Sequence, residues 1–376
     1  MSHRSKKRAS GFSLLEMVIS MALGTIVLGA AVQLYSQGVA ATWTVSQRAE
    51  MQQDFRAASD MLTHDLSLAG AGLGNSVAIA LPSTVNPIYG CDQTGTCYIN
   101  GGSLPYPKQG ATPYLYGLIP GLNDGPQINN PPGATDVVTV VYTDNTFYLN
   151  CYAATVTALG VVTFAPVVTV PATPFPPTGC LPNGVATPQA VNDTVAGLTA
   201  GDLVLMNLNG TSVIGEVTGT PTVTGANTYR VPFANLDVLH MNQTPAGGGL
   251  NSVGVGATGT NPTRILVITY YIDKTVTPPR LMRQESGHSP IPVAENVVYM
   301  KFSYDLYNDA TNLPAPNQAD GGASLGLLPD QITKINILHM AMDSTLKGAK
   351  GGFQGLDLET SVSARDLTYN NAYPIN

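Results

Sequence analysis

Apolar residues fill the chain from Gly11 to Val32 almost without interruption, directly after a leader that carries four basic residues. The 21 residues from Phe12 to Val32 would form a helix of roughly 30 Å, which is the hydrocarbon thickness of a bilayer. Glu16 is the one acidic residue in this stretch. An ionisable side chain inside such a segment is costly and indicates a function, so we expect Glu16 to have a positively charged partner.

After Gln33 the pattern becomes amphipathic and continues without proline to about residue 68. Apolar residues then recur at steps of three and four, which places them on one helical face: Met51, Phe55, Ala58, Leu62, Leu66 and Ala69. Charged residues fall mostly off this stripe: Asp54, Arg56, Asp60 and Asp65. The pattern predicts one helix of about 85 Å, whose second half packs on a globular domain and which ends at the glycines of residues 70–74.

The remainder of the chain has the pattern of strands and loops. Proline, glycine and asparagine indicate loops with short extended pieces from Pro82 to Pro132. Runs of β-branched or alternating apolar residues predict strands at 136–142, 160–170, 203–208, 212–218, 264–272, 298–306 and 332–342. Asn209-Gly210 is the strongest hairpin signal, and the Gly- and Thr-rich tract 246–260 indicates a surface loop. We therefore predict an α+β fold with a large β-rich carboxyl-terminal domain.

The residues Gly11-Phe12-Ser13-Leu14-Leu15-Glu16 resemble the processing signal of type IV prepilins and type II secretion pseudopilins. The resemblance implies that a prepilin peptidase cuts after Gly11 on the cytoplasmic side and methylates the new amino-terminal Phe12. Glu16 is then the fifth residue of the mature chain. An α-amino group has a pKa near 8, so the Phe12 amine of a neighbouring subunit can supply the cation that a buried Glu16 needs.

This interpretation divides the chain into a leader (1–11), a hydrophobic and amphipathic helix (12–70) and a β-rich extracytoplasmic domain (71–376), with possible sub-modules 71–260 and 261–376. Two other interpretations compete. A secretory signal peptide could be cut near residues 29–31, or the helix could be an uncleaved anchor. The basic leader keeps the amino end in the cytoplasm in all three cases. Neither alternative explains Glu16.

A second resemblance concerns PilW-type minor pilins. It is carried by Asp65-Leu66-Ser67-Leu68-Ala69-Gly70 at the end of the helix, and by the order of motifs across the last third of the chain. That order is a Tyr-Tyr strand, Leu-x-Arg, Glu-Asn-Val, an aromatic strand, a hydrophobic strand and Arg365-Asp366-Leu367. The resemblance implies a minor pilin in a priming or tip complex of a type IV pilus. A membrane helix without proline and a large globular part also favour a minor subunit.

The implied partners are the prepilin peptidase, other major and minor pilins, and the inner-membrane assembly machinery. The implied location is the inner membrane, with the globular domain in the periplasm, and then the pilus at the cell surface. One alternative is a minor pseudopilin of a type II secretion system. Another is a tip adhesin or DNA-uptake subunit that binds through loops 82–135 or 240–262.

Four cysteines follow the helix, namely Cys91, Cys97, Cys151 and Cys180. An even number in a chain sent across a membrane indicates disulfides. Three pairings are possible, and we favour Cys91–Cys97 with Cys151–Cys180 because each closes a local loop. A zinc site is a weak alternative, since the spacings lack close pairs of ligands.

Composition and motifs exclude several classes of function. The formal charge of −7 becomes −11 when the four basic residues of the leader are removed, which argues against nucleic acid binding along a whole face. Five histidines are scattered without HExxH spacing, and hydrolase, P-loop and dinucleotide motifs are missing. The acidic loop 305–320 could bind calcium but fails the EF-hand pattern. We therefore expect no enzyme activity, cofactor or metal.

Overall fold

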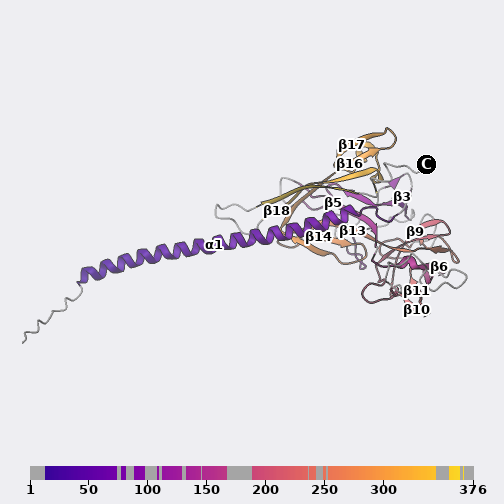
Figure 1. The fold of residues 1–376 in the computed structure, drawn as a ribbon, viewed down its shortest axis with the longest axis horizontal. Coiled ribbons are helices and arrows are strands. Elements are labelled where there is room, and N and C mark those ends of the chain that lie inside the picture. Colours follow the sequence, from indigo (N-terminus) through magenta and orange to yellow (C-terminus); the bar gives the residue numbers. More distant parts are fainter. Residues whose placement is uncertain are drawn as a thin grey trace, which may run out of the picture.

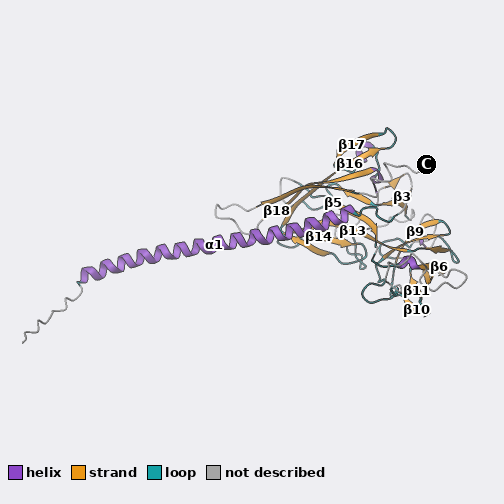
Figure 2. Cartoon of the chain, in the orientation of Figure 1, coloured by secondary structure: helices purple, strands orange, loops and turns teal. Residues whose placement is uncertain are grey.

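One long helix, α1 (Leu14–Ser67), projects from a β-rich body in the computed structural model, and its carboxyl-terminal part lies along that body (Figure 1). The structure describes residues 13–73, 78–81, 89–97, 108–109, 112–128, 133–144, 146–166, 189–235, 237–242, 249–250, 253–343, 355–364 and 367. Figure 2 shows that strands dominate the body. The predicted α+β class, with one long amino-terminal helix and a large β-rich domain, is confirmed. The domain boundaries proposed above stay predictions.

The strands among the described residues form four antiparallel sheets. A small sheet has the order β1 (Ala78–Ala80), β3 (Thr112–Tyr116), β2 (Lys108–Gln109). A five-stranded sheet has the order β10 (Thr222–Gly225), β11 (Thr228–Pro232), β7 (Val161–Pro166), β6 (Tyr152–Ala158), β12 (Thr258–Thr260). A seven-stranded sheet runs β15 (Ile291–Glu295), β14 (Arg280–Glu285), β13 (Thr263–Asp273), β5 (Val137–Thr143), β4 (Leu118–Gly121), and β8 (Leu203–Leu208) pairs with β13 and with β9 (Thr211–Glu216).

The fourth sheet has the order β17 (Leu313–Gln318), β16 (Val297–Asn308), β18 (Ile332–Asp343), β19 (Gly355–Ser363). Three 3-10 turns complete the described elements, η1 (Leu149–Cys151), η3 (Ala323–Leu325) and η4 (Pro329–Gln331). The strongest predicted hairpin is present, because β8 and β9 pair around Asn209 and Gly210, with φ of 53° and 84°. Positive φ at both turn residues is what a tight two-residue hairpin requires.

Several strands lie where the sequence pattern did not predict them. The edge strand β19 alternates exposed and half-buried residues along its length, and most of its side chains are polar or small. β12 lies inside the Gly- and Thr-rich tract that we expected to be a loop, and it pairs with β6. Both strands form because a neighbouring strand offers hydrogen-bonding groups, so their own hydrophobic pattern did not reveal them.

Strand β5 is buried along its whole length and separates two hydrophobic cores. Val138, Val140 and Tyr142 face the core that also holds the helix, whereas Val137 and Val141 face a second core on the other side. This division follows from the period of two along a strand. A third core fills the lobe built by β6, β7, β9 and β11. The hairpin β8–β9 connects this lobe to the seven-stranded sheet, called the central sheet below, because β8 also pairs with β13.

The predicted disulfide Cys91–Cys97 is present. Cys151 is disulfide-bonded as well, but Cys180 lies outside the described residues. The pairing Cys151–Cys180 therefore stays a prediction.

Two buried carboxyl groups, those of Glu216 and Asp237, form a pair. Glu216, at the end of β9, and Asp237 are 3% and 4% exposed, and their side chains share a hydrogen bond. Glu216 also accepts the Leu239 amide at 2.8 Å, and Asp237 accepts the Asn242 amide at 2.9 Å. Burial raises the pKa of Glu216 to about 8, and Asp237 adds to the shift while the Leu239 amide opposes it.

This pair makes the stability of the fold depend on pH. The folded protein holds a proton that the unfolded chain releases above its ordinary pKa of 4.5, so the stabilisation is complete below pH 4.5 and is lost as the pH rises toward 8. Glu216→Gln should remove this loss, because an amide can accept from Leu239 and donate to Asp237 without titrating. We expect the variant to be more stable than the wild type at pH 8 by a few kcal/mol, on the order of magnitude of the shift, and to differ less at pH 5.

Urea denaturation of the full chain in detergent, followed by circular dichroism at pH 5 and pH 8, measures the difference. Glu359→Gln is the matched control, because Glu359 is exposed on β19. An equal pH dependence in wild type and Glu216→Gln would show that the pair does not carry the effect.

Candidate functional site

The amino end of α1 is closed by a capping box. Ser13 is the N-cap, and its hydroxyl accepts the amides of Leu15 at 3.2 Å and Glu16 at 3.4 Å. The Glu16 carboxylate accepts the Ser13 amide in return at 3.1 Å. The pattern Ser-x-x-Glu is a known start signal of helices, so the sequence contained this second role of Glu16. The predicted processing residues Gly11 and Phe12 lie outside the described residues.

The first half of α1 presents apolar side chains on all sides. No described residue of the helix before Met51 is buried, and Leu14, Met21 and Leu34 are 83%, 69% and 71% exposed. The helix is long and apolar enough to cross a membrane. A helix that is hydrophobic all round needs lipid or protein around it. This half of the helix is therefore a surface suited to contact with membrane lipid or with another protein chain.

The second half of α1 packs on the body through the predicted stripe. All six predicted residues are buried, namely Met51, Phe55, Ala58, Leu62, Leu66 and Ala69. They share one core with the inward faces of β5, β13, β16 and β18. The amphipathic pattern therefore predicted this contact correctly.

Asp65 is the exception to the predicted pattern. We placed it off the apolar stripe, but Asp65 is only 3% exposed and lies within the contact between helix and sheet. Its carboxylate accepts the hydroxyls of Tyr142 at 2.9 Å and Tyr270 at 2.6 Å, and it pairs with the Nε of Arg283 at 2.8 Å. The stripe count failed here because a charged residue can lie on the buried face when its partners come from elsewhere in the chain.

The three partners of Asp65 come from adjacent strands, Tyr142 from β5, Tyr270 from β13 and Arg283 from β14. Burial, and then the negative charge of Asp65, raise the pKa of both tyrosines, so their hydroxyls stay protonated and donate. Burial opposes the charge of Arg283, but the hydrogen bond and charge of Asp65 raise its pKa overall. The helix is thus held by one carboxylate with three donors.

The chain leaves the helix by pairing with β5. The amide of Gly70 donates to Val141 O at 2.8 Å, and the amide of Thr143 donates to Ala71 O at 2.9 Å. Gly70 has φ of 81°, and an ideal Cβ on Gly117 would lie 2.7 Å from the Gly70 Cα. The predicted helix end at these glycines is confirmed, since they permit the turn and the close approach.

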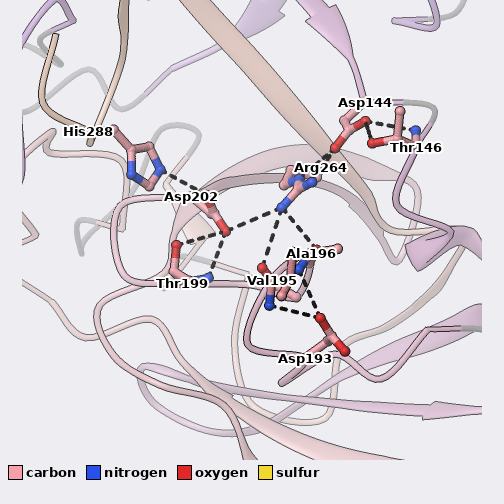
Figure 3. Close-up of polar contacts among 10 residues, drawn as sticks. Asp144, Thr146, Asp193, Val195, Ala196, Thr199, Asp202, Arg264 and His288 are labelled. Atoms are coloured by element: carbon pink, nitrogen blue, oxygen red, sulfur yellow. Dashed lines mark hydrogen bonds and ion pairs between the residues drawn. The ribbon is translucent and has the colours of Figure 1, made fainter. Parts of the chain in front are cut away.

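A second polar cluster surrounds Arg264 of β13 (Figure 3). Its Nε donates to Asp144 at 2.8 Å, and its Nη1 lies 3.7 Å from Asp202 and donates to Ala196 O at 3.3 Å. His288 Nε2 lies 2.9 Å from the other oxygen of Asp202. The guanidinium also lies 4.9 Å from the centre of the Phe147 ring, a cation–π contact. Arg264 therefore connects the central sheet to the loop before β8.

The same cluster borders a cavity of about 500 Å³. The cavity is lined by side chains of α1, β5, β13 and β14, with His64, Asp144, Arg264, Glu285 and His288 among them. Asp202, Glu285 and His288 are the described residues whose donor atoms converge closely enough to hold a metal ion. Sequence reasoning missed this group, because its members lie far apart in the chain and match no motif.

The acidic loop 305–320 does not form such a group among the described residues. Asp305 accepts the amide of Asn317 at 2.9 Å and the side chain of Asn336 at 3.2 Å. Asp320 accepts the amides of Gly322 at 3.0 Å and Ser324 at 2.8 Å. These carboxylates hold turns, which is the commoner use of loop carboxylates.

Residues 6–32 match the model of the prokaryotic N-terminal methylation motif. The match supports a type IV pilin-like protein. It covers the end of the leader, the cleavage signal and the start of the apolar helix, so it fits a pilin or a pseudopilin subunit and implies processing by a prepilin peptidase. No curated protein and no solved structure matches the chain.

The Asp65 contact predicts a large loss of stability when its carboxylate is removed. Asp65→Ala leaves the Arg283 charge and two tyrosine hydroxyls without their shared partner, and we expect a loss of about 3–5 kcal/mol. Glu295→Ala is the matched control, because Glu295 pairs with Arg280 at 3.0 Å with both side chains substantially exposed, and we expect less than about 1 kcal/mol.

Urea denaturation of both variants tests this difference. Replacing both partners, Asp65→Leu with Arg283→Met, should recover much of the loss because no buried charge is left unpaired. Equal stabilities of Asp65→Ala and Glu295→Ala would contradict the assigned role of Asp65.

Proposed function

We propose that this pilin-like chain is a structural, non-enzymatic minor pilin of a type IV pilus. It is cleaved after Gly11, methylated on Phe12, and assembled through α1 with other pilins. The observation that carries this proposal is the division of α1 into an apolar half without a buried residue and a half that is packed on the body. A pilus subunit needs both, because it leaves the membrane and exchanges lipid for neighbouring helices while its domain stays folded.

Before assembly, the exposed half of α1 lies in the inner membrane. The basic leader keeps the amino end in the cytoplasm, and the globular domain lies in the periplasm. The disulfide Cys91–Cys97 supports this placement, since disulfides persist in oxidising compartments. In the pilus the same apolar side chains pack against the helices of other subunits, so no second apolar surface is needed for assembly.

Glu16 acts in this proposal as the charge that sets the register of neighbouring helices. A carboxylate at the bilayer centre costs about 2.5–3.5 kcal/mol, and Glu16 lies close to the cytoplasmic end, where the cost is lower. In a helical bundle without water the carboxylate needs a cation, and the methylated amine of Phe12 in a neighbouring subunit supplies it. Loss of one member of such a pair leaves the other charge buried.

Two features support a role in a PilW-type priming or tip complex. The body is large for a subunit that must repeat along a fibre, and the motif Asp65-Leu66-Ser67-Leu68-Ala69-Gly70 coincides with the anchor that binds α1 to the central sheet. The prepilin peptidase is the first partner to test. Other major and minor pilins and the inner-membrane assembly machinery follow.

Processing is tested by mass spectrometry of the mature protein from cells that assemble the fibre. We expect N-methylphenylalanine at Phe12 as the first residue, because the cleavage signal places the cut after Gly11. Gly11→Val should block the cut and leave the full leader attached. A mature protein that begins at Met1 or near Ala31 would contradict the proposal.

Two variants separate the charge of Glu16 from its role in the capping box. Glu16→Gln can keep the cap, since glutamine serves at this position, but it removes the charge. Ser13→Ala removes the cap at a cost of about 1 kcal/mol and keeps the charge. We expect both variants to insert into the membrane, Glu16→Gln to lose most of its incorporation into filaments, and Ser13→Ala to retain it.

Immunoblots of sheared filaments and of membranes measure this ratio. Normal incorporation of Glu16→Gln would refute the charge pair, and a loss in Ser13→Ala alone would assign the role of Glu16 to helix capping.

A further inference from the structure

The cavity beside Arg264 contains three side chains with the chemistry of a metal site. Asp202 comes from the loop before β8, Glu285 ends β14, and His288 follows it in a turn. Their donor atoms all lie within 4.8 Å of one another. Two carboxylates and one imidazole on a cavity wall form a mixed oxygen and nitrogen donor set, which divalent transition metals prefer.

The backbone brings these residues together through two glycines. Gly201 and Gly287 have φ of +99° and +85°, and their chains touch. An ideal Cβ on Gly287 would lie 2.1 Å from the Gly201 carbonyl oxygen, and one on Gly201 would lie 2.4 Å from the Gly287 oxygen. Larger residues at either position would separate the two segments. Asp202 and the Glu285–His288 turn therefore meet in a fixed arrangement.

The turn that carries two of the donors is held from behind. The amide of His288 donates to Glu285 O at 2.9 Å, and the fully buried Gln284 donates its Nε2 to the carbonyl oxygens of Glu285 and His288 at 2.7 and 2.8 Å. Gln284 also donates to Cys91 O at 3.0 Å. The disulfide-closed loop of Cys91 and Cys97 thus supports the turn, which meets the requirement that a binding site stand on rigid elements.

The charges of the cluster leave room for a cation. Asp144, Asp202 and Glu285 contribute three carboxyl groups to the cavity. Glu285 accepts no hydrogen bond from the described residues that would fix its carboxylate elsewhere. His288 Nε2 lies 2.9 Å from Asp202 Oδ1, so these two donor atoms already face one another.

We propose that Asp202, Glu285 and His288 bind one divalent transition-metal ion of the Zn²⁺ class. An imidazole nitrogen and two carboxylate oxygens fit Zn²⁺ at about 2.0–2.2 Å each, whereas Ca²⁺ takes six to eight oxygen ligands. Three protein ligands leave one position of a tetrahedral ion directed to the cavity. Because Asp202 lies in the loop before β8, Glu285 ends β14 and His288 follows it in a turn, the ion would link two segments that are distant in the chain.

Equilibrium dialysis of the full chain in detergent, after treatment with chelator, tests this site with Zn²⁺ as the probe. We expect one Zn²⁺ per chain in the wild type, with affinity at least about tenfold lower in Glu285→Gln and in His288→Gln. His339→Gln is the matched control, because His339 is exposed on β18 and lies 3.0 Å from Asp357. It should bind as the wild type does.

Thermal unfolding of each variant without metal shows whether it folds, and added Zn²⁺ should raise the Tm of the wild type and of His339→Gln alone. If Glu285→Gln does not fold, His288→Gln carries the test. Wild-type affinity in a folded Glu285→Gln or His288→Gln would overturn the proposal. Absence of stoichiometric Zn²⁺ binding, or preferential binding of Ca²⁺, would overturn it as well.

Discussion

The ion pair between Asp65 and Arg283 fixes how the helix sits on the globular body. The apolar stripe supplies most of the buried area, but apolar contact alone is non-directional and tolerates sliding. A shift of α1 by one turn would move Asp65 by about 5.4 Å and separate it from Tyr142, Tyr270 and Arg283. Since a buried carboxylate without partners is costly, the carboxylate selects one register among those that the stripe allows.

That register determines how much helix extends beyond the body. The 37 residues from Leu14 to Glu50 precede the first buried residue, and they span about 55 Å. This length exceeds the roughly 30 Å of a hydrocarbon core, so the apolar segment can cross a bilayer while the body stays clear of its surface. Because of this separation, one half of the continuous helix can lie in lipid while the other half is packed on the body.

The sequence predicted those parts of the structure that local pattern determines. The long helix, the packed stripe, the hairpin at Asn209-Gly210 and the Cys91–Cys97 disulfide all follow from periodicity, turn chemistry or short separation. What it did not predict depends on residues that meet only in the fold. Asp65 was placed on the exposed side because its partners are 77 to 218 residues away. The cluster of Asp202, Glu285 and His288 needs two glycines to touch across the chain, and no spacing in the sequence records that.

The pairing of the segment after α1 with β5 has a mechanical consequence. β5 is an interior strand, hydrogen-bonded to β4 on one edge and to β13 on the other. Traction along α1 reaches it through the Asp65 contacts and through the bonds of Gly70 and Ala71. Such a load is shared by the Asp65 side-chain contacts and by the two backbone hydrogen bonds. The body is thus attached to its helix at two places on one interior strand, by a side-chain contact at Tyr142 and by backbone pairing at Val141 and Thr143.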